Sequence, residues 1–387
     1  MKRTKQQNQK FNQGITLVAL VVTIVVLLIL SSVSLNLVLG DNGIIVKAKE
    51  AAETTAAAQE KEAMERNLLE KELENSLSTP VVEPTDGVKI PTGFYYVGGT
   101  KASGIVISDN KNDKNKYRNQ KVVGTDLLGN QYVWIPCTTD NTSSDLQYTR
   151  TEWGVEVDGD DNSRAIKDEL TLTDASVTSS DADTANGINA DVSKEIVAQI
   201  NAEKTSVAKY GGYYIGRYEV GKNGDTAVVK YNQTPYASIT WSTAYGLAKK
   251  IITNSEATSY LCSSYAWDTA VNFIQNNSTA KNYATSIEGF NGNWNPQEVK
   301  DPSGNVIKPA GTSQQLNTGL TTQFCNIFDM GGNEAEFTTE LNPGTSETVV
   351  LSGGSYYYHD DPAGYRWDGS SGAAYIDYGF RATLFLK

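Results

Sequence analysis

The chain has 387 residues, and 45 acidic against 33 basic side chains give it a formal net charge of −12. Its 39% hydrophobic content is that of a folded protein and excludes collagen-like, proline-rich and disordered chains. The length allows one small segment with one large domain, or two ordinary domains. Residues 1–14 carry four basic and no acidic side chains, so the remainder has a net charge of −16. Such an acidic chain cannot neutralise phosphates, and we predict no nucleic-acid partner.

Histidine and cysteine are scarce, which limits the metal sites and redox motifs that the chain can form. The single histidine, His359, excludes a His-rich metal site. The three cysteines, Cys137, Cys262 and Cys325, have no CxxC spacing, which excludes zinc ribbons and thioredoxin-type redox motifs. The sequence leaves open whether Cys262 and Cys325 pair in an oxidising compartment or remain free thiols.

A long apolar segment opens the chain. Residues 15–39 carry no charge and contain mostly Val, Leu and Ile. As a helix they would extend about 37 Å, enough to cross a bilayer core of about 30 Å with some tilt. The run is long for a cleaved signal peptide, so this pattern predicts a membrane-spanning helix, of which a plain membrane anchor is the simplest kind.

The basic leader that ends at Gly14 and the apolar run that begins at Ile15 resemble a type IV prepilin. The resemblance implies that a prepilin peptidase cleaves after Gly14 and that Ile15 is methylated. It also implies a cell-membrane location before assembly, and packing with other pilin subunits in a surface filament afterwards. The fifth mature position is Ala19, where the family usually has a glutamate, so we predict a minor or tip subunit.

The next segments predict a stalk and a linker. The helical pattern resumes after the turn formers at 41–43, so we assign 15–77 to a transmembrane and stalk helix. Residues 78–91 contain three prolines and are predicted to be a linker to a domain over 92–387.

The residue pattern over 92–387 predicts an α+β fold with many loops. Runs of β-branched and aromatic residues predict strands at 93–97, 131–135, 212–220 and 348–351, and apolar spacing predicts helices at 240–251 and 264–274. Residues 138–190 hold 12 acidic against 3 basic side chains and are predicted to be a solvated insertion.

Three motifs in the same order resemble the formylglycine-generating-enzyme type of C-type-lectin fold. They are Gly211–Glu219, Asn326–Phe337, and Gly353–Ser355 followed by Gly379–Leu384. This resemblance covers about 210–387 and implies that fold for the domain.

The same resemblance raises, and then argues against, an oxidase. In the enzymes two cysteines after the Gly-Gly-Ser turn bind copper as thiolates. The matching positions here are Tyr358 and Ala363, and no cysteine follows Cys325. Neither a Ser-His-Asp nor a Cys-His constellation is visible. We therefore predict a protein that is not an enzyme, with no catalytic residue and no catalytic cofactor.

The resemblance also implies a structural calcium site. The matching oxygen ligands are the Asp329 carboxylate, the Gly332 and Glu334 carbonyls, and the Glu336 carboxylate. The motif departs from the family at 335–337, where Ala-Glu-Phe stands for Trp-Glu-Trp. The alternative is a glycine turn whose carboxylates cap a helix.

Residues 355–378 have the composition of a recognition surface. They are rich in Tyr, Ser, Gly and Asp and contain no Lys, Glu or Gln. The alternative is that the tyrosines only pack a C-terminal sheet. The predicted ligand-binding residues are Tyr356, Tyr357, Tyr358, His359, Asp360, Asp361, Tyr365, Trp367, Asp368, Tyr375, Asp377 and Tyr378.

This segment also resembles the variable region of proteins that retroelements diversify by mutating adenines. Mutation of both adenines in an AAC codon never yields Lys, Glu, Gln, Met or Trp, and Trp367 is the one exception in 355–378. We therefore predict a cell-surface pilus subunit that binds an external protein or glycan through this segment, fixed or diversified. The alternatives are a structural pilus subunit without a ligand and, least favoured, an oxidase.

Overall fold

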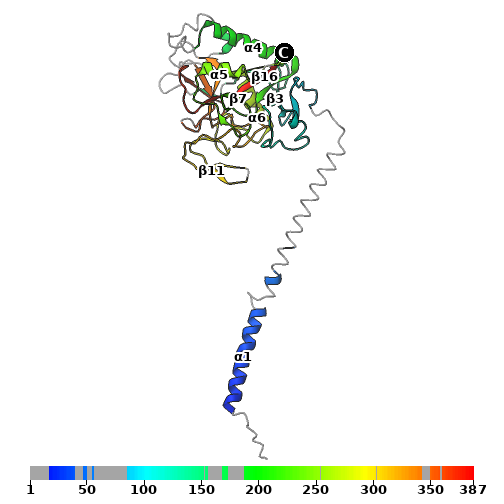
Figure 1. The fold of residues 1–387 in the computed structure, drawn as a ribbon, viewed down its shortest axis with the longest axis vertical. Coiled ribbons are helices and arrows are strands. Elements are labelled where there is room, and N and C mark those ends of the chain that lie inside the picture. The colour runs from blue at the N-terminus through cyan, green and yellow to red at the C-terminus, as the bar shows by residue number, and fades with distance from the viewer. Residues whose placement is uncertain are drawn as a thin grey trace, which may run out of the picture. The chain divides into compact units, whose positions relative to one another are not determined.

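The computed structural model describes residues 17–39, 47–49, 55, 85–151, 153–155, 168–172, 187–252, 254–301, 303–341, 349–357 and 360–387. They belong to two compact units, Met1–Pro80 and Val81–Lys387, and we describe each by itself. Figure 1 gives the course of the chain and the element labels. The predicted processing residues Gly14 and Ile15 lie outside the described residues, as do Tyr358 and His359.

The first unit contains helix α1, Leu17–Leu39, with 23 residues. The hydroxyls of Thr23 and Ser31 donate to carbonyls four residues earlier, so these polar side chains are satisfied within the helix. Every side chain that is described in α1, over 17–32, is exposed. Among the described residues no helix is both long and apolar enough to cross a membrane. Of the predicted stalk, 47–49 and 55 are helical and the rest is outside the described residues.

The second unit is built on a six-stranded antiparallel sheet. In spatial order its strands are β1 (Tyr95–Gly98), β2 (Ile105–Ser108), β3 (Gln131–Pro136), β5 (Gly212–Gly216), β16 (Ala382–Leu386) and β9 (Ala257–Leu261). Five of these strands are buried on both faces along almost their whole length, whereas β9 alternates between buried and half-buried residues.

A second sheet has five strands in the order β15 (Tyr378–Phe380), β12 (Ala335–Leu341), β13 (Val349–Ser352), β14 (Tyr365–Gly369) and β4 (Gly154–Val155). The pairs β12–β15 and β14–β4 are parallel and the others antiparallel. Smaller elements are β6 (Gly221–Asn223), β7 (Thr226–Val228), β8 (Thr234–Pro235), β10 (Val299–Lys300), β11 (Val306–Lys308) and the 3-10 helices η1 (Lys111–Asp113) and η2 (Glu169–Thr171).

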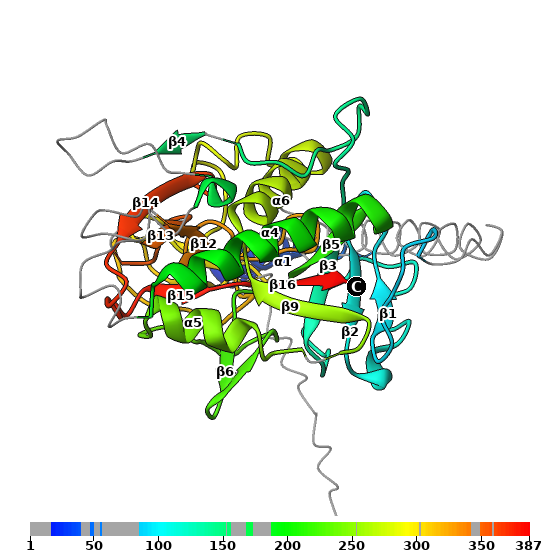
Figure 2. The ribbon, with the colours of Figure 1, turned by 90° about the horizontal axis from the view of Figure 1, so that it is seen from above.

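Three helices cover these sheets: α4 (Ala190–Tyr210), α5 (Trp241–Ala248) and α6 (Ser264–Asn277). Side chains of Asn189, Thr240 and Ser263 cap their first turns. Helix α4 lies along the first sheet, over β5 and β16, while α6 contacts both β3 and β12 (Figure 2). The core is therefore continuous from one sheet to the other.

One buried arginine, Arg381, forms hydrogen bonds to both sheets. Arg381 stands between β15 of the second sheet and β16 of the first. Its Nε and Nη2 atoms donate to the Glu336 carboxylate on β12 at 3.0 and 2.6 Å. Its Nη1 atom donates to the Gly216 carbonyl on β5 at 3.0 Å. The Gly-Phe-Arg ending is therefore the corner at which the chain changes sheets.

The α+β class is confirmed, and the strands expected near 93–97, 131–135, 212–220 and 348–351 and the helices near 240–251 and 264–274 are all present. Three differences stand out. Helix α4 was not predicted. The insertion at 138–190 is partly core, since Tyr148, Glu169 and Ile188 are buried. The predicted linker contributes Val88 to the core, because its apolar side chain is buried in the larger hydrophobic cluster.

Candidate functional site

The two ends of the 355–378 segment lie together. The Ser355 hydroxyl donates to the Asp377 carboxylate at 2.6 Å, and the Tyr356 hydroxyl donates to the Ile376 carbonyl at 3.4 Å. The start of β12 and the turn before it hold the two ends, because Tyr356 N–H donates to the Asn333 carbonyl and Ala335 N–H donates to the Asp377 carbonyl, each at 2.9 Å. The residues just after Ser355 and just before Asp377 therefore belong to one small surface.

The structure divides the predicted ligand-binding residues by exposure. Tyr357 and Tyr375 are 40% and 57% exposed, and Asp360 is exposed. Partly exposed are Asp361, Tyr365 and Asp368. These six residues can meet an external ligand.

Four of the predicted residues lie beneath that surface: Tyr356, Trp367, Asp377 and Tyr378. Trp367 and Tyr378 meet edge to face at 5.1 Å between ring centroids, and Tyr378 packs on Phe337 of β12 in the same way at 5.6 Å. Tyr375 rests on the Tyr378 ring at 5.0 Å. The buried rings therefore support the exposed ones, and their expected role in direct contact is corrected to a supporting one.

Ile376 is a surface residue that the sequence reasoning missed. It is 52% exposed between Tyr375 and the buried Asp377. Six large hydrophobic side chains are exposed in the described part of 85–387, and three of them are Tyr357, Tyr375 and Ile376. An apolar residue in an otherwise polar tip was the available signal.

The middle of the segment is anchored by Arg366 on β14. This buried guanidinium donates to Glu340 at 2.7 Å, to Asp268, and to the Thr151 carbonyl at 3.2 Å. Burial opposes its charge, but the two carboxylates outweigh burial and raise the Arg366 pKa above its ordinary value. Arg150 also pairs with Glu340, so the insertion and β14 are held by one ionic network.

Two of the predicted calcium ligands, the Asp329 and Glu336 carboxylates, accept hydrogen bonds from protein donors. Both oxygens of Glu336 accept from Arg381, and those of Asp329 accept from Gly319 N–H at 2.9 Å and from the Thr321 hydroxyl. Burial raises the pKa of both carboxyls, that of Glu336 to about 7. Within the described residues no group of three His, Cys, Asp or Glu side chains could hold a metal ion. Protein donors therefore already occupy both carboxylates, and the calcium site, which also includes the Gly332 and Glu334 carbonyls, stays a prediction.

Around that motif the side-chain amide of Asn333 connects several segments through hydrogen bonds. It accepts from Asn293 at 2.7 Å and from Leu316 N–H at 3.0 Å, and it donates to Glu219. Burial raises the pKa of Glu219 well above its ordinary value, and nearby Asp329 adds to the rise. The motif predicted for calcium thus forms a buried, hydrogen-bonded turn.

The two positions that match the copper-binding cysteines, Tyr358 and Ala363, carry no thiol. Ala363 is fully buried, and its carbonyl accepts from Trp267 Nε1 at 2.7 Å. All three cysteines are free thiols, so Cys262 and Cys325 do not pair. Burial raises the pKa of the Cys137 and Cys262 thiols, which favours the unreactive thiol form. The expectation of a non-catalytic protein stays a prediction.

Comparisons with known proteins found no family and only weakly similar solved structures. No family profile matches the chain, and no curated protein matches it. A solved structure titled "Crystal Structure of CarF" aligns with 15% identity and a TM-score of 0.29, covering 46% of this chain and 87% of that one. "Treponema denticola variable protein 1" aligns with 17% identity and a TM-score of 0.25, covering 48% and 67%. TM-scores this low carry no argument about fold or function.

Proposed function

We propose that the chain is a non-catalytic cell-surface protein whose 355–378 segment binds an external protein or glycan. The observation that carries the proposal is that Tyr357, Tyr375 and Ile376 are exposed at the two ends of the segment, which hydrogen bonds hold together. Tyrosines on a fixed frame offer a large contact area at a small cost in conformational entropy. The segment therefore meets the physical requirements of a recognition surface.

The lectin-type fold and the filament role belong to the same proposal. The motifs that resemble the lectin fold form the corner of the two sheets and the turn at Asn333. The described side chains of α1 over 17–32 are mostly apolar and all exposed, which supports a role in which neighbouring pilin helices or lipid cover them. In this proposal the prepilin peptidase cleaves after Gly14, and the protein joins a type IV-like filament as a minor or tip subunit.

Replacing Tyr357 and Tyr375 together with alanine tests the binding role. Truncating two central aromatic side chains of an interface is expected to weaken binding by about tenfold or more. Filament-bearing cells would be measured for adhesion to arrays of immobilised glycans and proteins, with filaments counted by electron microscopy. Leu128→Ala, another exposed hydrophobic outside the segment, is the matched control. Lost filaments would instead support the structural-subunit alternative, and unchanged adhesion would refute the binding role.

Sequencing the gene across one population tests diversification. Substitutions should fall at adenines of codons for exposed residues such as Tyr357, Asp360 and Tyr375, while the buried Arg366 and Trp367 stay constant. Trp367, the one residue outside the adenine set, is buried in the frame, as this proposal requires. An invariant 355–378 segment would leave a fixed binding surface and refute diversification.

Peptide sequencing tests the filament role. The mature protein from sheared cell-surface material should begin at methylated Ile15. A protein that begins at Met1 would contradict cleavage by a prepilin peptidase.

A further inference from the structure

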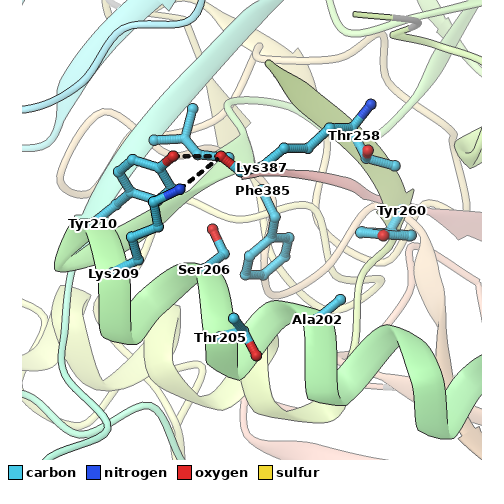
Figure 3. Close-up of a pocket in the computed structure, with 10 residues that line it drawn as sticks. Ala202, Thr205, Ser206, Lys209, Tyr210, Thr258, Tyr260, Phe385 and Lys387 are labelled. Atoms are coloured by element: carbon cyan, nitrogen blue, oxygen red, sulfur yellow. Dashed lines mark hydrogen bonds between the residues drawn. The ribbon is translucent and has the colours of Figure 1, made fainter. Parts of the chain in front are cut away.

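A small pocket lies in the second unit between α4, strand β9 and the end of β16. Its volume is about 280 Å³, and none of its lining residues belongs to the 355–378 segment. Figure 3 shows Lys209 and Tyr210 at one side, Tyr260 and Thr258 at the other, and Phe385 between them. This volume suits a ligand of one ring.

A buried hydroxyl at the base of the pocket has no partner among the residues that the structure describes. Ser206 is only 4% exposed, and its Oγ makes no hydrogen bond to any of them. In Figure 3 this oxygen points from α4 into the pocket. A buried hydroxyl without a partner costs free energy, which a ligand hydroxyl placed beside it would recover.

The charged side chains that line the pocket are basic, although the protein is acidic. They are Lys209 and Lys387, with no Asp or Glu, and the Lys387 ammonium donates to the Asn254 carbonyl at 2.8 Å. The Lys209 ammonium lies 4.7 Å from the Tyr210 ring centroid and 3.4 Å from the main-chain oxygen of Lys387, which hold it at the rim. With a chain net charge of −12, a site free of acidic side chains favours an anionic ligand.

The remaining lining combines an apolar floor with hydroxyl groups. The Phe385 ring stacks on Tyr213 at 5.2 Å and is thereby fixed as the floor. Thr258 and Tyr260 lie on alternate positions of β9, so both side chains point to the same face. The aromatic floor can pack against the C–H face of a ring, and the hydroxyl groups of the lining can bond the hydroxyls of that ring. The Lys209 ammonium can pair with a carboxylate on the same ring.

We propose that this pocket binds one acidic monosaccharide unit, a hydroxylated ring that carries a carboxylate. Lys209 pairs with the carboxylate, Ser206 bonds a ring hydroxyl, and Phe385 packs against the C–H face. The site is independent of the 355–378 surface, so either can fail while the other holds.

Calorimetric titration of the purified full chain with millimolar D-glucuronate tests the proposal. A ligand of this size is expected to bind with a Kd of about 1 mM. Glucose lacks the carboxylate and should bind at least about threefold more weakly. Benzoate keeps the carboxylate but lacks the hydroxyls, and it should also bind more weakly. Benzoate binding as tight as that of glucuronate, or no glucuronate binding, would overturn the proposal.

Variants locate the binding. Ser206→Ala should weaken glucuronate binding by about fivefold, and Lys209→Gln by about threefold. Ser206→Ala should leave Tm unchanged or raise it, because it removes a buried polar atom without a partner in the described part of the chain, so weaker binding cannot be ascribed to unfolding. Lys194→Gln, on the same helix but outside the pocket, and Tyr375→Ala are controls that should bind as before. Unchanged affinity in both pocket variants would refute this site.

Discussion

Glu203 on α4 shows how one buried side chain connects distant parts of the chain. Its carboxyl accepts from Tyr148 of the insertion and from Ser263 before α6, each at 2.7 Å, and from Gln199 at 2.9 Å. Burial raises its pKa from 4.5 to about 7, although these hydrogen bonds oppose the rise. The carboxyl that joins three segments is thus held partly as the neutral acid.

This pKa predicts a pH dependence of stability. Between pH 4.5 and 7 the native state keeps a proton that the unfolded chain has lost, so the free energy of unfolding falls as pH rises. Glu203→Gln should reduce the fall between pH 5 and 8 by about 2–3 kcal/mol. The amide can keep the three contacts because the hydroxyls of Tyr148 and Ser263 also accept.

Urea unfolding at both pH values measures this effect. Glu195→Gln is the control on the same helix, since Lys249 lowers the pKa of that exposed carboxyl. The control should retain the fall in stability. An equal fall in Glu203→Gln and the unaltered protein would contradict the prediction.

At the scale of elements, β14 depends on an ionic anchor as well as on sheet hydrogen bonds. Arg366 connects it to β12 through Glu340 and to α6 through Asp268. All three side chains are buried. Removing the arginine would leave two buried carboxylates without their main counter-charge, which costs far more than the loss of an exposed pair.

Arg366→Met is therefore expected to lower the free energy of unfolding by about 3–5 kcal/mol. Thermal unfolding measures the loss, and Lys222→Ala on the exposed part of β6 is the control. Adding Asp268→Asn and Glu340→Gln to Arg366→Met should recover part of the stability, because no unpaired charge then stays buried. A loss below about 1 kcal/mol would show that the network is not an anchor.

At the scale of the whole molecule, Arg381 supplies the positive charge at the junction of the two sheets. Because its guanidinium already occupies both oxygens of Glu336, the domain does not need a divalent cation there. Adding EGTA should leave Tm unchanged, and calcium should not raise it. A Tm that falls with EGTA and recovers with calcium would support the calcium site predicted from the sequence.

Helix α4 shows where local sequence patterns stop being informative. The strands and helices α5 and α6 have enough apolar residues on one face to be predicted. The buried face of α4 contains Ser193, Gln199, Glu203 and Ser206 beside its aliphatic residues. Gln199 and Glu203 have hydrogen-bond partners far along the chain. Because four polar residues interrupt the buried face, apolar periodicity is weak there, and the pocket that α4 forms with β16 was not foreseen.

The sequence alone determined the acidic charge, the apolar run at 15–39, the main strands and two helices, and the unusual composition of the segment that we propose as a recognition surface, because these depend on composition and local spacing. Tertiary structure alone decided which residues of that region face solvent. Tyr356 and Tyr357 are neighbours of one type, yet the first is buried and the second exposed. The same holds for Tyr378 and Tyr375. Their exposure depends on packing against β12 and on the contact between Ser355 and Asp377, which connects residues 22 positions apart.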